Sequence, residues 1–325
     1  MADQFTGTTT SGNLTGYGTV QAAYDALTRL PLRAELIYVQ FANVRPTQQT
    51  APGSSVAINF GADLSDATSA LTEGADPDAV ATSVTAVTVT LAEYGNVVSS
   101  TAKLRGTSYA AVDPDIAERI GRNAGSTLDQ LGQNALDAGS NTMVAADVAT
   151  TALSGGTAAH YLTAAEVRQA RNNLRSGNAK QMRGMGAYVG IIHPDQYYDL
   201  SGETGAGAWR TPREYADPSD IYMAEAGFFE GFRFFENTRV KVEADAGSGT
   251  SDVYTANFLG DEALAMVHSI RDGNSPMPSI VIKNGSLDKL DRFNYIGWKW
   301  LGGFGEARSA GNVLMHTASS LSPAA

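Results

Sequence analysis

Two segments of the chain alternate apolar and polar residues, which is the pattern of half-buried strands. In Ser55–Phe60 the apolar side chains recur at every second position, and Val84–Leu91 repeats the pattern with threonines between valines. β-branched residues at a period of two predict strands. The connection between them is long, so we predict an extended two-stranded ribbon. Because an isolated ribbon is only marginally stable, we expect its base to lie on another surface.

A period close to that of an α-helix begins near residue 113 and predicts one long helix over 114–138. Asp113 suits the N-cap and Pro114 the first helical position. Apolar residues then recur every three or four positions, and Gly139 is a suitable stop. The helix would be about 37 Å long at about 1.5 Å per residue. Three glycines lie inside it, where we expect another element to approach closely: Gly121, Gly125 and Gly132.

The rest of the chain mixes short helices with short strands. The stretch 34–42 is mostly apolar, and its pattern leaves open a strand or a helical turn. Thr163 and Glu166 form a capping-box pattern before a helix that ends at Gly177. Further strand patterns cover 188–192, 228–235, 240–242, 253–259, 264–267 and 293–300. Strands, one long helix and then a mixed set predict an α+β fold rather than alternating β–α–β units.

Composition narrows the class of protein. With 325 residues the chain exceeds the roughly 250–300 at which one hydrophobic core stops growing, so we expect at least two lobes. It has no cysteine, which excludes disulfides and thiolate metal sites. The net charge of −11 argues against a dedicated nucleic-acid binder. Because we find neither a secretory pattern nor an apolar run of membrane length, we expect folding in the cytoplasm and no membrane partner.

Charge is distributed unevenly along the sequence. Residues 46–102 contain six acids and no lysine or arginine, whereas residues 168–183 contain five bases and no acid. Opposite clusters on one chain can hold copies of that chain together, so both are candidates for contacts between subunits. The acidic candidates are Asp63, Asp66, Glu73, Asp76 and Asp78, and the basic candidates are Arg168, Arg171, Arg175, Lys180 and Arg183.

Motifs of catalysis are missing from the sequence. It contains no phosphate-binding loop, no His-Glu-x-x-His motif and no Gly-x-Ser-x-Gly elbow. None of the four histidines has a second metal ligand at helical spacing. We therefore predict no catalytic residue, no metal site and no cofactor. A soluble hydrolase with His193 as base and Asp195 as its orienting acid stays an alternative, although a capping role for His193 is the simpler interpretation.

Several phrases of the sequence resemble the major capsid proteins of tailed phages, which have the Hong Kong 97-like fold. Leu104-Arg-Gly-Thr followed by Asp113-Pro-Asp-Ile-Ala-Glu-Arg resembles the approach to their spine helix. Val189-Gly-Ile-Ile-His-Pro-Asp and Gly227-Phe-Phe-Glu-Gly-Phe-Arg are similar to parts of their axial domain. Tyr295-Ile-Gly-Trp-Lys-Trp-Leu resembles a late strand of their peripheral domain. The resemblance extends over most of the chain.

This resemblance implies a domain layout. Residues 1–36 would be an N-terminal arm and residues 46–103 an extension loop that reaches over a neighbouring subunit. A peripheral domain would contain the spine helix, and an axial domain would cover 155–290. The peripheral domain would consist of 37–45, 104–154 and 291–325.

The resemblance also implies a structural role and not an enzyme. Copies of the chain would form pentamers and hexamers of an icosahedral virion capsid, assembled in the host cytoplasm around double-stranded DNA that is contacted non-specifically. Portal, scaffold and decoration proteins are further expected partners. An encapsulin-like compartment around a cargo enzyme is the alternative with the same fold. The ribbon has no lysine, which argues against a Lys–Asn cross-link there, and the short N-terminal region favours a separate scaffold or none.

Overall fold

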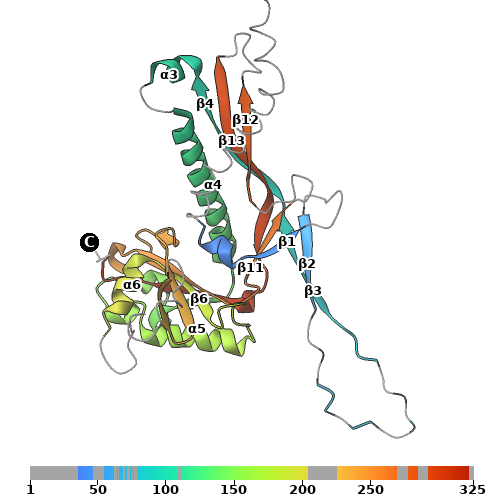
Figure 1. The fold of residues 1–325 in the computed structure, drawn as a ribbon. Coiled ribbons are helices and arrows are strands. Elements are labelled where there is room, and N and C mark those ends of the chain that lie inside the picture. The colour runs from blue at the N-terminus through green and yellow to red at the C-terminus, as the bar shows by residue number, and fades with distance from the viewer. Residues whose placement is uncertain are drawn as a thin grey trace, which may run out of the picture.

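The computed structural model describes residues 36–46, 55–61, 64, 66–68, 70–71, 74, 76, 79–108, 112–203, 225–268, 277–284 and 292–321. The protein has two lobes and a projecting ribbon (Figure 1). The elongated lobe is a sheet with one long helix along it. The compact lobe is a second sheet with two shorter helices. This mixed architecture is the α+β class predicted from the sequence.

Five strands and the long helix make up the elongated lobe. The strands are β1 (Asn43–Pro46), β4 (Ala92–Thr101), β11 (Leu264–His268), β12 (Ser279–Asn284) and β13 (Phe293–Glu306). The hydrogen-bonded order is β1-β11-β13-β12, and β4 also pairs with β13. β13 is 14 residues long, so its first half pairs with β4 and β12 and its end pairs with β11. It continues well past residue 300, where the sequence pattern ends.

The long helix α4 (Val112–Asp137) lies along this sheet and follows the short helix α3 (Ala102–Thr107). Its buried side chains, among them Ile120 and Leu128, pack against Trp298 and Trp300 of β13. The indole N–H of Trp298 donates to Asn123 of α4 at 2.9 Å. The predicted long helix is thus present, and its apolar stripe covers the sheet.

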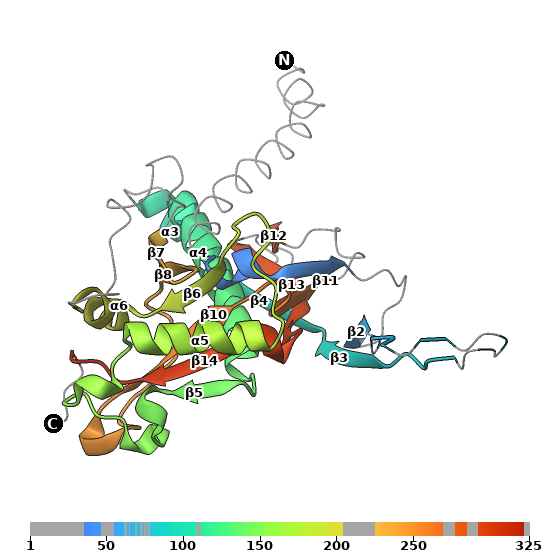
Figure 2. The ribbon, with the colours of Figure 1, turned by 90° about the horizontal axis from the view of Figure 1, so that it is seen from below.

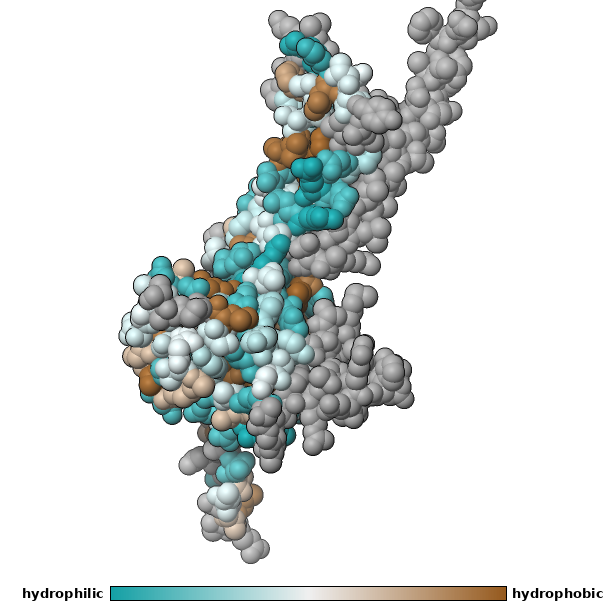
Figure 3. Space-filling model, turned by 90° about the vertical axis from the view of Figure 1, so that its left-hand side faces the viewer, coloured by the Kyte–Doolittle hydropathy of each residue, from teal (hydrophilic) through white to brown (hydrophobic). Residues whose placement is uncertain are grey.

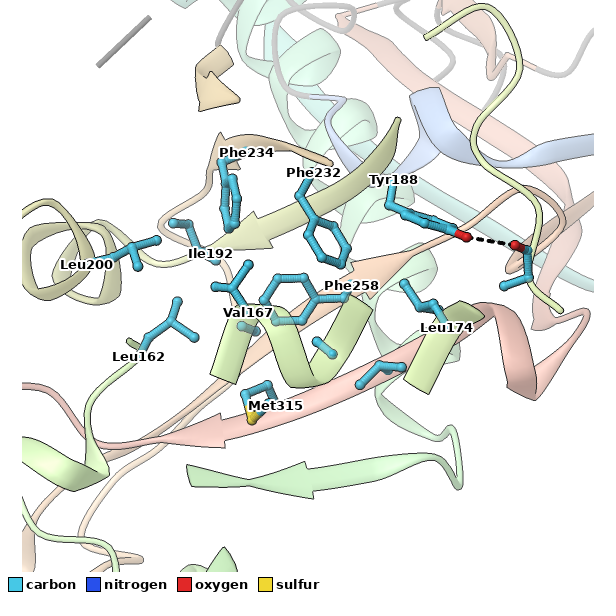
Figure 4. Packing of buried hydrophobic residues seen from close by; sticks show 14 residues of the cluster. Leu162, Val167, Leu174, Tyr188, Ile192, Leu200, Phe232, Phe234, Phe258 and Met315 are labelled. Atoms are coloured by element: carbon cyan, nitrogen blue, oxygen red, sulfur yellow. Dashed lines mark hydrogen bonds between the residues drawn. The ribbon is translucent and has the colours of Figure 1, made fainter. Parts of the chain in front are cut away.

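The compact lobe contains a seven-stranded sheet in the order β5-β14-β10-β6-β8-β7, with β9 beside β10. Its strands are β5 (Thr142–Val144), β6 (Tyr188–Ile192), β7 (Glu225–Phe229), β8 (Phe232–Glu236), β9 (Val242–Glu243), β10 (Val253–Leu259) and β14 (Asn312–Thr317). Helix α5 (Ala164–Ser176) lies on the sheet, and α6 (Pro194–Ser201) follows β6. The core between α5 and the sheet is aromatic, with Phe232 edge-on to Phe258 at 4.9 Å between ring centroids (Figure 4).

Short 3-10 helices connect these elements. They are η1 (Tyr38–Phe41), η2 (Ala145–Asp147), η3 (Thr150–Ala152), η4 (Ala158–His160), η7 (Ser248–Thr250) and η9 (Ser309–Gly311). The ambiguous apolar stretch 34–42 therefore resolves, over its described part, into a helical turn followed by β1 rather than one strand.

One local prediction was wrong, and a second was borne out only in part. The segment 228–235 was expected as one strand, but it bends back into the β7–β8 hairpin at Glu230 (φ 49°) and Gly231 (φ 85°). Two positive φ values are the geometry of a two-residue type I′ turn, and the surrounding phenylalanines hid that signal. The capping box at α5 is half formed: the side chain of Thr163 makes no capping hydrogen bond, whereas the carboxylate of Glu166 accepts the backbone N–H of Thr163.

Candidate assembly surfaces

The ribbon consists of β2 (Ser55–Gly61) and β3 (Val84–Thr90), which pair antiparallel over seven residues. It projects away from both lobes (Figures 1 and 2). The alternation that predicts these strands also decides which side chains turn inward, because successive residues point to opposite faces. Ile58 and Val89 are buried on the inner face.

The base of the ribbon is seated on the elongated lobe. Ile58 and Val89 pack against Ala265 and Val267 of β11 and against Ala307, which follows β13. The predicted need for a supporting surface is therefore met.

Two glycines of β13 allow β3 to lie close against it at the base of the ribbon, a contact that we call the ribbon seat. A Cβ added to Gly303 would lie 2.2 Å from the carbonyl oxygen of Thr90, and one added to Gly305 would lie 2.7 Å from Cγ2 of Val89. Sequence reasoning missed this role, although glycines inside a strand are a known signal of close backbone approach.

Beyond its seat the ribbon exposes apolar side chains. Leu64, Leu71, Val80 and Val84 are all more than half exposed, and Leu71 reaches 79%. Single exposed leucines are ordinary, but four on one projecting segment are typical of a surface that another molecule covers.

The acidic candidates fall on the same segment. Asp66 and Asp76 are exposed and form no ion pair with any described residue. Three other candidates, Asp63, Glu73 and Asp78, lie outside the described residues. The described part of the ribbon connection is therefore acidic and apolar at once.

The basic candidates divide into two groups. Arg168 and Arg171 on α5 both bind the carboxylate of Glu230, at 2.9 and 3.1 Å, and Arg183 binds Asp261 at 2.9 Å. The partner of the α5 arginines is the residue at the turn of the β7–β8 hairpin. These three arginines therefore neutralise carboxylates of their own chain.

Arg175 and Lys180 form the second group. Both are exposed near the C-terminal end of α5, and neither has an ion pair among the described residues. Lys180 also lines a groove of about 780 Å³ between the compact lobe and the base of the ribbon, which Thr85 and Val87 of β3 line from the other side. These two side chains are the basic candidates best placed to meet another molecule.

The outer face of α4 is polar. Arg119 pairs with Asp115 at 3.0 Å and Arg122 with Glu118 at 2.7 Å, each one helical turn apart. In Figure 3 the elongated lobe is largely hydrophilic on the side shown, with separate apolar patches. Such exposed pairs contribute little to stability, about 0.3–0.5 kcal/mol each.

His193 has a structural role. It is the N-cap of α6: its Nδ1 accepts from the backbone N–H of Asp195 at 3.2 Å, and Gln196 accepts from the backbone N–H of His193 at 3.0 Å. Burial lowers the pKa of His193, and nearby Asp195 opposes that shift. Both halves of a capping box are thus present at α6, whereas α5 has only one, and the ring of His193 serves as the cap.

Neither a metal centre nor a membrane span is evident in the described part of the chain. No three His, Asp or Glu side chains there gather closely enough to hold a metal ion. None of its helices is both long and apolar enough to cross a bilayer.

The sequence profile of a family described as phage capsid protein matches residues 8–315. The chain belongs to the phage capsid protein family. It is a structural major capsid protein of a phage virion and not an enzyme, so the hydrolase alternative is not favoured. No curated protein sequence matches this capsid protein.

Solved structures with the same fold are capsids of several phages. The capsid of Ralstonia phage GP4 has a TM-score of 0.65 at 14% identity, covering 86% of this chain and 87% of that one. The capsid of cyanophage Pam1 has a TM-score of 0.64 at 15% identity, covering 90% and 93%. The capsid of cyanophage P-SCSP1u has a TM-score of 0.63 at 13% identity, covering 88% and 89%. The Hong Kong 97-like fold predicted from the sequence is thereby confirmed.

Proposed function

We propose that this capsid protein assembles with copies of itself into pentamers and hexamers of an icosahedral shell around double-stranded phage DNA. The observation that carries the proposal is the ribbon, which projects from its own lobes with exposed apolar and acidic side chains. A segment of this kind gains burial only by lying on another molecule. The net charge of −11 suits a container whose wall does not bind phosphate strongly.

The further partners are part of the same proposal. DNA contacts at the inner face would be non-specific, and portal, scaffold and decoration proteins would complete a particle assembled in the host cytoplasm. The proposed peripheral and axial domains overlap only in part with the elongated and compact lobes. Strands β11 and β12 fall within 155–290 but belong to the sheet of the elongated lobe, and β5 and β14 fall within the proposed peripheral ranges but belong to the sheet of the compact lobe. Strand β4 falls inside the proposed extension loop of 46–103 yet pairs with β13, so the projecting part is shorter than that range.

Within the shell, the acidic ribbon of one subunit would bind the basic end of α5 on its neighbour. The two surfaces are different patches of one chain, and such a head-to-tail interface closes into rings when the rotation between subunits allows. Arg175 and Lys180 are the basic side chains available for this contact. Each exposed pair would contribute about 0.2–1 kcal/mol, and the many copies in a ring add these small contributions together.

The test reverses these two charges. Arg175→Glu with Lys180→Glu should lower the yield of particles, measured by sedimentation and electron microscopy, while circular dichroism and the unfolding temperature stay as in the parent. Lys103→Glu on α3 changes the net charge as much as Lys180→Glu alone and is the matched control for that single reversal, because Lys103 is exposed and has no ion pair among the described residues. Arg171 is unsuitable, because its reversal would set two carboxylates against each other at Glu230.

A charge swap completes the design. Asp66→Lys with Asp76→Lys should restore particle yield to the doubly reversed α5 variant, since the attraction then returns with opposite signs. Normal particle yield from the reversed variant would refute the contact. Loss of yield without rescue would assign Arg175 and Lys180 to a different interface.

A further inference from the structure

A short segment ahead of β1 belongs to both lobes. Leu36 and Val39 are buried in the hydrophobic cluster of the elongated lobe. Tyr38 and Phe41 are buried in a separate cluster with residues of the compact lobe, where the ring of Phe41 lies 5.1 Å from that of Phe235. This segment, which contains one turn of 3-10 helix, therefore lies between the two lobes, and its side chains pack into the hydrophobic clusters of both.

One buried carboxylate fixes the position of this turn. Asp129 of α4 is 1% exposed, and its Oδ1 accepts the backbone N–H groups of Ile37 at 2.8 Å and Tyr38 at 2.7 Å. The turn has no side-chain cap from its own N-cap residue, so Asp129 supplies the acceptor from a distant part of the chain. Its other oxygen lies 3.4 Å from Nδ2 of Asn237, which follows β8 in the compact lobe.

A second set of bonds extends the connection. The hydroxyl of Tyr38 donates to Asn257 of β10 at 3.3 Å, and the amide of Asn257 donates to Asp137 at the end of α4 at 3.1 Å. The carboxylates of Asp129 and Asp137 thus reach the compact lobe through Tyr38 or an asparagine. None of these links is visible in the sequence, where the partners lie 91 or more residues apart.

We propose that the segment Leu36–Ala42 is a latch that sets the angle between the two lobes, and that Asp129 is the residue that closes it. Hydrophobic contacts are non-directional and tolerate sliding, whereas two short bonds to a carboxylate fix one geometry. Without those bonds the apolar side chains keep the segment in place, but the lobes sample a range of angles.

The experiment measures the lobe angle directly in the full-length chain. Because the protein has no cysteine, Ser99→Cys on β4 and Ser176→Cys at the end of α5 give one spin label on each lobe. Asp129→Leu keeps roughly the size of the side chain and removes both acceptor oxygens. This substitution should broaden or shift the distribution of distances between the two spin labels, measured by double electron–electron resonance. It should also speed hydrogen exchange at the backbone amides of residues 37 and 38 by about tenfold or more.

Asp115→Leu is the matched control, since Asp115 is an exposed aspartate of the same helix and its replacement should leave both measurements unchanged. Faster exchange with an unchanged distance distribution would overturn the proposal and reduce Asp129 to a helix cap. Unchanged exchange would overturn it as well. If Asp129→Leu does not fold, Tyr38→Phe removes only the bond to Asn257. A broadened distribution in that variant supports the latch, and an unaltered one overturns it.

Discussion

The seat of the ribbon gives the sharpest quantitative prediction, for the substitution Gly303→Ala. The new Cβ would lie 2.2 Å from the carbonyl oxygen of Thr90 and 3.1 Å from Cγ1 of Val89. The first of these atoms is backbone, so it cannot rotate away. Ordinary contact between heavy atoms needs about 3.5 Å, so the base of the ribbon must move by more than about 1 Å.

This displacement should cost about 1–3 kcal/mol, the usual range for an overpacked interior. For a folded unit of roughly 150–250 residues each kcal/mol lowers Tm by about 2–4 °C, so we expect a fall of about 2–12 °C. Assembly should suffer more than stability does, because tilting the base redirects the whole projecting ribbon. Scanning calorimetry measures the first effect and sedimentation of particles the second.

Gly61→Ala is the matched control for Gly303→Ala. Gly61 ends β2 of the same ribbon, and a Cβ there meets nothing within 4 Å. We expect this control to keep the parent values of both Tm and particle yield. If Gly303→Ala behaved like Gly61→Ala, the close seating of β3 on β13 would be refuted.

Two further substitutions test the compact lobe and the pH response. Glu230→Gln should lower Tm by only a few degrees, because it removes the partly exposed partner of Arg168 and Arg171; an unchanged Tm would show that these pairs contribute nothing. Burial lowers the pKa of His268, so the folded state keeps it neutral and stability falls as pH drops below about 6.5. His268→Gln should therefore lose less Tm between pH 7 and pH 5 than the parent, and equal losses would contradict this account.

Some elements could be predicted from the sequence because neighbouring residues alone determine them. The strands β2 and β3 followed from strict alternation, and α4 followed from an N-cap, a proline and a helical period that all agree. The long β13 was only partly predicted, because its glycines at 302, 303 and 305 weaken the strand pattern where β3 crosses it. At these glycines the contact with β3, and not the local sequence pattern, determines that β13 continues as a strand.

The candidate contacts were harder to predict, since a run of like charges does not reveal its partners. Arg168 and Arg171 find Glu230 at separations of 62 and 59 residues. Glu230 reaches them only because it occupies a hairpin turn that was mistaken for the middle of a strand. One missed turn thus concealed two ion pairs, and left Arg175 and Lys180 undistinguished from their neighbours in the sequence.

The shared strand β13 constrains how chains of this kind can vary in length. It pairs with β4, β12 and β11, and it also carries the indoles that cover α4 and the glycines that seat the ribbon. An insertion of one residue in its middle would turn every later side chain to the opposite face. The pairing of β13 with its neighbouring strands and its contact with the base of the ribbon would then be disrupted together. Viable insertions and deletions should accordingly collect in the connection between β2 and β3, whose described residues pair with no strand.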